Sequence, residues 1–216
     1  MAFKRQKTGI KELDKMLNGG IPERSSIVIT GGLGTGKTAL TMQLLYNAAK
    51  NGDRCLFVSL EESPQDIIDQ STSFGWNVGD LVKKNMIIIQ HHVQLDYDSL
   101  EVSIENTLRK YKDIKFVAVD PISMLKIYFK SETGFRIALF RLSQLFKKHN
   151  TTAFLVEDET ESTASRFVSD GVIMLKIEKK ETGKVRTLEV PKMRKTAHEI
   201  EPVTFKITDK GIQLFL

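Results

Sequence analysis

Short apolar runs alternate with longer amphipathic segments through most of this chain. The runs that predict strands are 27–31, 54–59, 86–90, 115–119 and 152–156. The segments that predict helices are 37–50, 64–73, 97–112 and 133–149. Because the runs are nearly continuous in Val, Ile and Phe, we expect both faces of each strand to be covered. The alternation predicts an α/β fold, in which crossover helices flank a mostly parallel, twisted sheet.

The pattern changes after residue 170, where short alternating runs follow one another without helices between them. The strands expected there are 172–179, 184–191, 203–207 and 212–215, with turn signals at 181–183 and 208–211. We interpret them as antiparallel strands that extend one edge of the sheet. The expected organisation is a single domain over 1–216. It consists of an N-terminal lead-in (1–26), an α/β core (27–170) and a C-terminal β extension (171–216).

Composition adds few constraints. The 216 residues are 41% hydrophobic and 27% charged, with a net charge of +5, which is ordinary for a soluble domain. The one cysteine, Cys55, excludes an internal disulfide and lies in an apolar run, where a buried thiol is expected. No apolar stretch has the length of a membrane span, and the first residues lack the apolar core of a signal peptide. We therefore expect a cytoplasmic protein that does not enter a membrane.

A glycine-rich motif lies between the first expected strand and the helix that follows it. Gly31, Gly36, Lys37 and Thr38 fit the P-loop pattern G-x-x-x-x-G-K-[ST]. In such a loop, backbone N–H groups and the helix N-terminus bind phosphate oxygens, the lysine reaches the β- and γ-phosphates, and the hydroxyl ligates Mg²⁺. The motif predicts a nucleoside triphosphate site. Its expected nucleotide-binding residues are Gly32, Leu33, Gly34, Thr35, Gly36, Lys37, Thr38 and Ala39.

Carboxylates follow two other expected strands. Asp120 directly follows the run 116–119, which is the Walker B pattern of a magnesium ligand. Glu61 and Glu62 follow the run 57–60, and a carboxylate at a strand exit can take the proton of an attacking water. These two acids also suit a helix entry, because Ser63 and the proline after it form an N-cap signal. Both interpretations can hold, and Glu61 is the favoured catalytic residue, with Glu62 and Lys37 beside it.

Two basic segments have a functional and an ordinary interpretation. Lys192 and Arg194 can reach the γ-phosphate on another subunit or simply face solvent on a strand. The segment 126–130 interleaves lysines with aromatics, as single-strand nucleic-acid binders do, but also suits an amphipathic helix with extended lysines. The acidic cluster 157–161 argues against nucleic acid, because it would repel phosphates.

Together the motifs resemble the KaiC-like branch of the RecA/RadA ATPases, in its single-domain archaeal form. The blocks that carry the resemblance are 8–14, 19–22, the P-loop, 57–64, 73–76, 167–170, 192–198 and 207–212. The resemblance implies a RecA-like fold and a homo-oligomeric ring, usually a hexamer, with ATP or ADP and Mg²⁺ between subunits. It also implies that Glu61 and Glu62 are catalytic, and that Lys192, Arg194 and His198 contact the neighbour's nucleotide.

The chain departs from the family pattern at two places in the sequence and in its number of ATPase domains. Leu155 and Val156 stand where relatives commonly carry small polar residues, which leaves the hydrolysis rate open. Lys195 replaces a frequent glycine, and the single ATPase domain disfavours a circadian oscillator.

Three functions stay open at this stage. The first is an ATP hydrolase that works as a ring and couples nucleotide state to a regulatory partner. The second is a slow, nucleotide-gated signalling module. The third, and least favoured, is a RadA-like accessory protein that binds single-stranded DNA.

Overall fold

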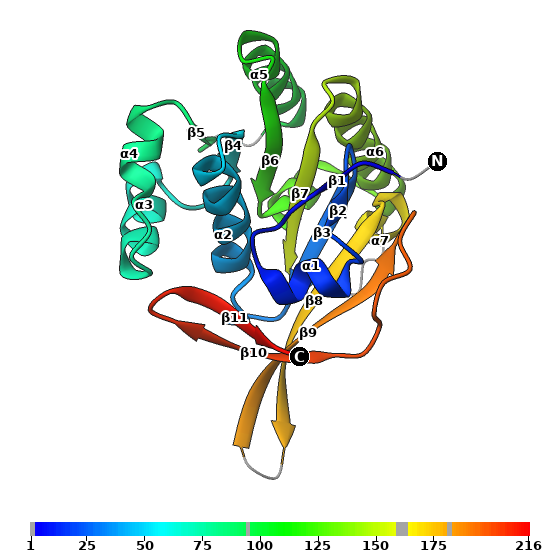
Figure 1. Ribbon diagram of the computed structural model, residues 1–216. Helices are drawn as coiled ribbons and strands as arrows, with labels where there is room; N and C mark the ends of the chain where they lie inside the picture. Colours follow the sequence, from blue (N-terminus) through cyan, green and yellow to red (C-terminus); the bar gives the residue numbers. More distant parts are fainter. Residues whose placement is uncertain (1–2, 94–95, 159–163, 181–182) are drawn as a thin grey trace.

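The computed structural model describes residues 3–93, 96–158, 164–180 and 183–216 (Figure 1). Within these residues, nine strands form one twisted sheet in the order β11-β10-β9-β8-β3-β7-β6-β4-β5, and β1 pairs with β2 in a small second sheet. Helices cover both faces of the large sheet. The α/β fold expected from the sequence is confirmed.

The core of the sheet is parallel. Its strands are β3 (Ser26–Gly31), β4 (Arg54–Ser59), β5 (Ile87–His91), β6 (Ile114–Asp120), β7 (Thr152–Asp158) and β8 (Gly171–Lys180). All pairs among them are parallel, so their carboxyl ends meet at one edge. The five apolar runs predicted as strands all lie in this set, within two residues of the observed bounds.

The antiparallel extension consists of β9 (Gly183–Met193), β10 (Val203–Thr208) and β11 (Gly211–Phe215). The antiparallel strands expected after residue 170 are confirmed, since β8, β9, β10 and β11 pair antiparallel in that order. In addition, β8 pairs in parallel with its core neighbour β3. The physical reason for the parallel pairing is the short helix α7 (Ala164–Val168), which returns the chain to the start of β3, where Asp170 N–H donates to the carbonyl of Ser26. Beyond Ile177, β8 and β9 continue as a two-stranded ribbon that projects from the sheet (Figure 1).

Alternate residues of the central strands enter two separate cores. Ile27 and Ile29 of β3 pack on one side with α1 (Lys11–Met16), α2 (Lys37–Lys50), α3 (Pro64–Ser73) and α4 (Val78–Lys83). Val28 packs on the other side with α5 (Tyr97–Lys110), the 3-10 helix η1 (Ile122–Tyr128), α6 (Glu132–Lys148) and α7. Burial on both faces explains why the strand sequences are continuously apolar.

Residues 3–26 include a helix that packs into the core. The strands β1 (Arg5–Gln6) and β2 (Ile21–Pro22) flank α1, whose Leu13 is fully buried together with Leu17 just after the helix. Among the described residues, no helix combines the length and the hydrophobicity that crossing a membrane requires.

Candidate functional site

The P-loop joins the end of β3 to the start of α2. The Lys37 ammonium donates to the carbonyls of Gly31 (2.9 Å) and Gly32 (3.1 Å), so the lysine folds back over the loop. Gly36 adopts φ +103°, and a Cβ there would lie 2.8 Å from Cδ1 of Ile207 on β10. The site therefore depends on a glycine both for its backbone conformation and for its contact with the C-terminal strands.

The residues expected to bind the nucleotide form one continuous turn. Thr35 is buried, and its hydroxyl donates to the Gly32 carbonyl at 2.9 Å. Leu33 is 91% exposed, so its backbone rather than its side chain suits phosphate binding. Thr38 and Ala39 follow Lys37 in the first turn of α2, where free N–H groups and the helix dipole favour an anion.

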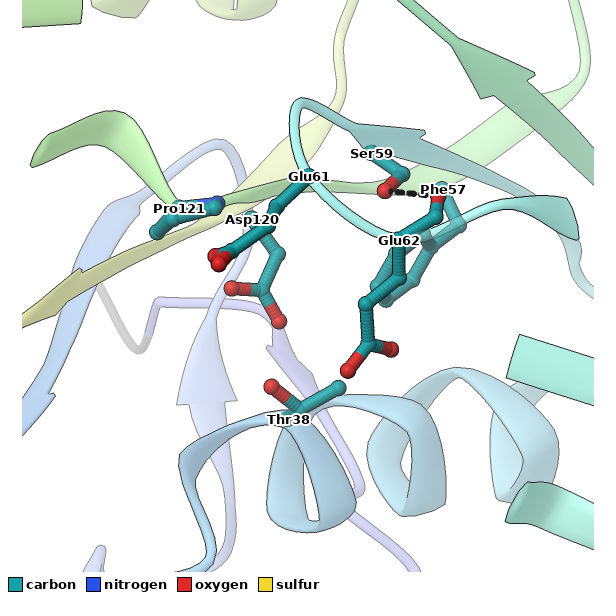
Figure 2. A pocket seen from close by; sticks show the side chains of 7 residues that line it. All are labelled: Thr38, Phe57, Ser59, Glu61, Glu62, Asp120 and Pro121. Carbon is teal, nitrogen blue, oxygen red and sulfur yellow. Dashed lines mark hydrogen bonds between the residues drawn. The ribbon is translucent and has the colours of Figure 1, made fainter. Parts of the chain in front are cut away.

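The carboxylates predicted from the strand exits gather beside this helix. Thr38, Ser59, Glu61, Glu62 and Asp120 line one pocket, together with the rings of Phe57 and Pro121 (Figure 2). They come from α2, from β4 and the turn after it, and from the end of β6. Since these elements lie far apart in the sequence, the parallel sheet is what brings the side chains together.

Asp120 is the most perturbed acid in the pocket. Burial raises the pKa of Asp120 to about 7, and the negative charges of Glu62 and Asp158 act in the same direction. A hydrogen bond from the Thr38 hydroxyl and the charge of Lys37 partly oppose this rise. Asp120 Oδ2 is buried and has no hydrogen-bond partner among the described residues. An acid in this state favours a cation nearby.

These residues fit Mg²⁺. A carboxylate oxygen and a hydroxyl are hard ligands, and a cation beside Asp120 would satisfy its unpartnered oxygen. No group of three His, Cys, Asp or Glu side chains that could hold a metal occurs in the part of the chain that the structure describes. A magnesium ion here would therefore take its other ligands from phosphate oxygens and water, as is usual at nucleotide sites.

The two adjacent glutamates differ in how they are held. Glu62 Oε1 accepts a 2.9 Å hydrogen bond from the Gln70 side-chain amide of α3, whereas Glu61 is exposed. The helix-entry interpretation also holds: α3 begins at Pro64, and the Ser63 hydroxyl accepts from the N–H of Asp66. The same short turn thus starts a helix and presents two carboxylates to the pocket.

Two contacts to the P-loop were not predicted. Asp158, at the end of β7, lies 3.1 Å from the Lys37 ammonium and accepts a 2.8 Å hydrogen bond from Ser123. Arg186 on β9 donates to the Gly34 carbonyl at 3.3 Å. Asp158 could have been found as the acid that ends the strand next to β3, but we interpreted it only as part of a phosphate-repelling cluster. No motif in the sequence around Arg186 indicates a contact with the P-loop.

Lys192 and Arg194 lie far from their own P-loop. Arg194 N–H donates to the Asp170 carbonyl, and Asp170 in turn bonds the start of β3. The P-loop begins five residues further along β3, about 16 Å away at the usual rise of a strand. The structure therefore does not bring Lys192 and Arg194 to the phosphate site of the same chain.

The side chains of these residues and of His198 have local partners. The Lys192 ammonium donates to the carbonyls of Arg166 (2.8 Å) and Ser169 (2.6 Å). Burial lowers the pKa of Lys192, and the nearby Arg194 adds to this. Arg194 lies 3.7 Å from an Asp170 carboxylate oxygen, and His198 Nδ1 lies 3.2 Å from the Thr196 carbonyl. Arg194 is the most exposed of the three.

Of the aromatic and basic segment 126–130, residues 126–128 form the end of the 3-10 helix η1. The Lys126 ammonium lies 3.4 Å from the buried carboxylate of Glu157 and 5.4 Å from the centre of the Phe135 ring. Ile127 is 76% exposed. Of the acidic cluster 157–161, the residues 159–161 lie outside the described part of the chain.

Comparisons with known proteins agree with this geometry. A family model described as "ATPase: KaiC" matches residues 6–216. The chain is 30% identical to a UPF0273 protein of Thermotoga maritima over 99% of this chain and 96% of that protein. It is 31% identical to the circadian clock oscillator protein KaiC of Parathermosynechococcus lividus over 98% of this chain, but spans only 42% of that relative. The solved structure of a KaiC-like protein from Pyrococcus horikoshii matches with a TM-score of 0.91 and 28% identity, covering 99% of this chain and all of that one.

Proposed function

Because this chain belongs to the KaiC family of ATPases, we propose that it binds ATP with Mg²⁺ at the P-loop and hydrolyses it at a site completed by a second copy. The observation that carries the proposal is the pocket in which Thr38, Asp120 and Glu62 face one another beside the phosphate-binding loop (Figure 2). We further propose a single functional unit over 1–216 and a cytoplasmic location.

The chain's own groups account for binding. Backbone N–H groups from Gly32 to Ala39 surround the phosphates, and Lys37 leaves its carbonyl partners to neutralise the terminal phosphate. Thr38 and Asp120 would hold Mg²⁺, which would supply charge stabilisation to the phosphate oxygens. The raised pKa of Asp120 falls when a cation lies beside it, so the carboxylate binds in its ionised form.

Glu61 and Glu62 are proposed to act on the attacking water. Either carboxylate can orient this water and accept its proton, because both line the pocket that contains the metal ligands. Phosphoryl transfer depends mainly on positioning and on charge stabilisation, so the cations that approach the γ-phosphate matter as much as the base.

The position of Lys192, Arg194 and His198 supports a site between subunits. Lys192 and Arg194 lie at the amino end of β3, at the end of the strand opposite to their own P-loop, and His198 follows four residues after Arg194. If they contact a nucleotide, it is bound to another copy. A closed ring, of six copies by family resemblance, gives every P-loop such a neighbour.

Phosphate release from Mg-ATP tests the proposal. We expect turnover by the wild type, loss of nucleotide binding in Lys37→Ala, and slow turnover with retained binding in Glu61→Gln or Glu62→Gln. Glu201→Gln, at an exposed position away from the pocket, is the matched control and keeps wild-type turnover. Release that is unchanged in both pocket variants would contradict the assignment of the base.

A slow, nucleotide-gated module that signals to a regulatory protein is the second candidate. The ion pair between Asp158 and Lys37 favours it, because the lysine must leave this carboxylate before it can bind the γ-phosphate. Leu155 and Val156 are fully buried in β7 and offer the nucleotide no polar group. If the protein is such a module, Asp158→Asn should raise the rate of ATP turnover. A turnover rate typical of ordinary enzymes, measured with the isolated wild type, would count against the module.

Binding of single-stranded DNA has less support. Lys126 pairs with Glu157 inside the fold, which leaves less positive charge in the segment 126–130 for phosphates. A labelled oligonucleotide titrated over a salt series tests this function, since phosphate contacts weaken as salt rises.

A further inference from the structure

The turn after β4 holds one of its two glutamates and leaves the other unrestrained. The Glu62 backbone carbonyl accepts a 2.6 Å hydrogen bond from the Ser59 hydroxyl, and its side chain accepts one from Gln70 at 2.9 Å. No hydrogen bond or ion pair of the Glu61 side chain is found within the described ranges. A carboxylate held in place, as Glu62 is, favours catalysis, because it needs no reorganisation when the substrate binds.

The hydrogen bond from Gln70 orients the Glu62 carboxylate. An ionised carboxylate only accepts hydrogen bonds, so the amide must present its NH₂ group to Oε1. The second oxygen, Oε2, is buried and has no partner in the described structure. Figure 2 shows the Glu62 carboxylate pointing toward Thr38, and its negative charge contributes to the raised pKa of Asp120. The Glu62 carboxylate as a whole therefore points toward the expected metal ligands, and its Oε2 has no partner among the described residues.

We infer that Gln70 is a positioning residue, which holds the Glu62 carboxylate toward the phosphate site and makes Glu62 rather than Glu61 the preorganised carboxylate. The inference rests on the proposed ATP hydrolysis and refines it. Gln70 is also suitably placed on α3, because it lines a small hollow with Thr38 and Ala39 at the start of α2. Loss of the amide lets the carboxylate rotate without changing the P-loop.

The kinetic test compares Gln70→Ala with Gln65→Ala. Gln65 lies on the same helix, is exposed, and bonds Asp69 instead of the pocket. We expect Gln70→Ala to lower kcat by about tenfold with little change in KM for Mg-ATP, and Gln65→Ala to change neither. Gln70→Asn, which keeps the NH₂ group on a shorter side chain, should recover part of the loss.

Combination with Glu62→Gln separates positioning from a general effect on the fold. In the Glu62→Gln background, Gln70→Ala should cause no further loss, because the residue it positions is already gone. In the Glu61→Gln background the tenfold loss should persist. Equal losses in both backgrounds, or a loss seen in KM alone, would overturn the inference.

Absence of phosphate release by the wild type would contradict the proposed hydrolysis but not the positioning of Glu62. A spectroscopic measurement tests that positioning independently of turnover. With ¹³C-carboxyl glutamate, the Glu62 signal is assigned as the one missing from Glu62→Gln. It should move in Gln70→Ala and stay in place in Gln65→Ala. An unmoved signal in Gln70→Ala overturns the positioning role, whatever the turnover.

Discussion

The buried charge of Asp120 predicts that the site destabilises the fold when no cation is bound. Burial raises the pKa of this carboxyl from its ordinary value of 3.8 to about 7. Between these values the native state binds more protons than the unfolded state, so the free energy of unfolding falls as pH rises from about 4 to about 7. This rise of about three units in the pKa corresponds to a loss of about 4 kcal/mol in the free energy of unfolding. Above pH 7 this loss is complete and constant.

Asp120→Asn removes the charge and keeps the shape. Urea unfolding with a chelator present should show the variant to be more stable than the wild type at pH 8, by up to about 4 kcal/mol, and by much less at pH 4.5. Mg-ADP should narrow the difference at pH 8, because it stabilises the wild type more than the variant. A variant that is equally or less stable at pH 8, or a difference that does not change with pH, would refute this reasoning.

Three further predictions follow from particular contacts. Gly36→Ala places a Cβ 2.8 Å from Ile207 at φ +103°, so we expect about 1–2 kcal/mol lower stability and weaker ATP binding, measured by urea unfolding and calorimetry; unchanged values would contradict the packing. Arg194→Ala should lower turnover by about 10³-fold while a fluorescent ATP analogue still binds, and a parallel loss of binding would place Arg194 elsewhere. Leu13→Ala should lower the free energy of unfolding by about 2–5 kcal/mol, since α1 is part of the core; a change below about 1 kcal/mol would show that α1 contributes little to the core.

Features of the fold with a local cause could be predicted from the sequence. The P-loop, the strand that ends at Asp120 and the helix entry at Ser63 are each specified by adjacent residues, and the structure has them at those places. The direction of β8 could not be predicted, because it depends on the return of the chain through α7 and on the pairing with β3. Short strands have the same sequence pattern in either direction.

The parts of the site that were missed depend on pairing between distant segments. Asp158 meets Lys37 only because β7 pairs with β3, and Arg186 reaches Gly34 across a gap of 152 residues. Asp158 has only the general pattern of an acid at a strand end, and nothing in the sequence around Arg186 marks it as a P-loop contact. The positions of Lys192 and Arg194 at the far edge of the sheet likewise follow from the register of β8 with β9.

Complementation between two inactive variants tests the shared site most directly. Arg194→Ala chains keep an intact P-loop pocket, and chains with both Glu61→Gln and Glu62→Gln keep Arg194. Mixed and allowed to exchange subunits in Mg-ATP, they should release phosphate faster than either variant alone, because some pockets then receive both an intact base and an arginine. A mixture whose turnover never exceeds the average of its two components would contradict an ATPase site formed between copies of this chain.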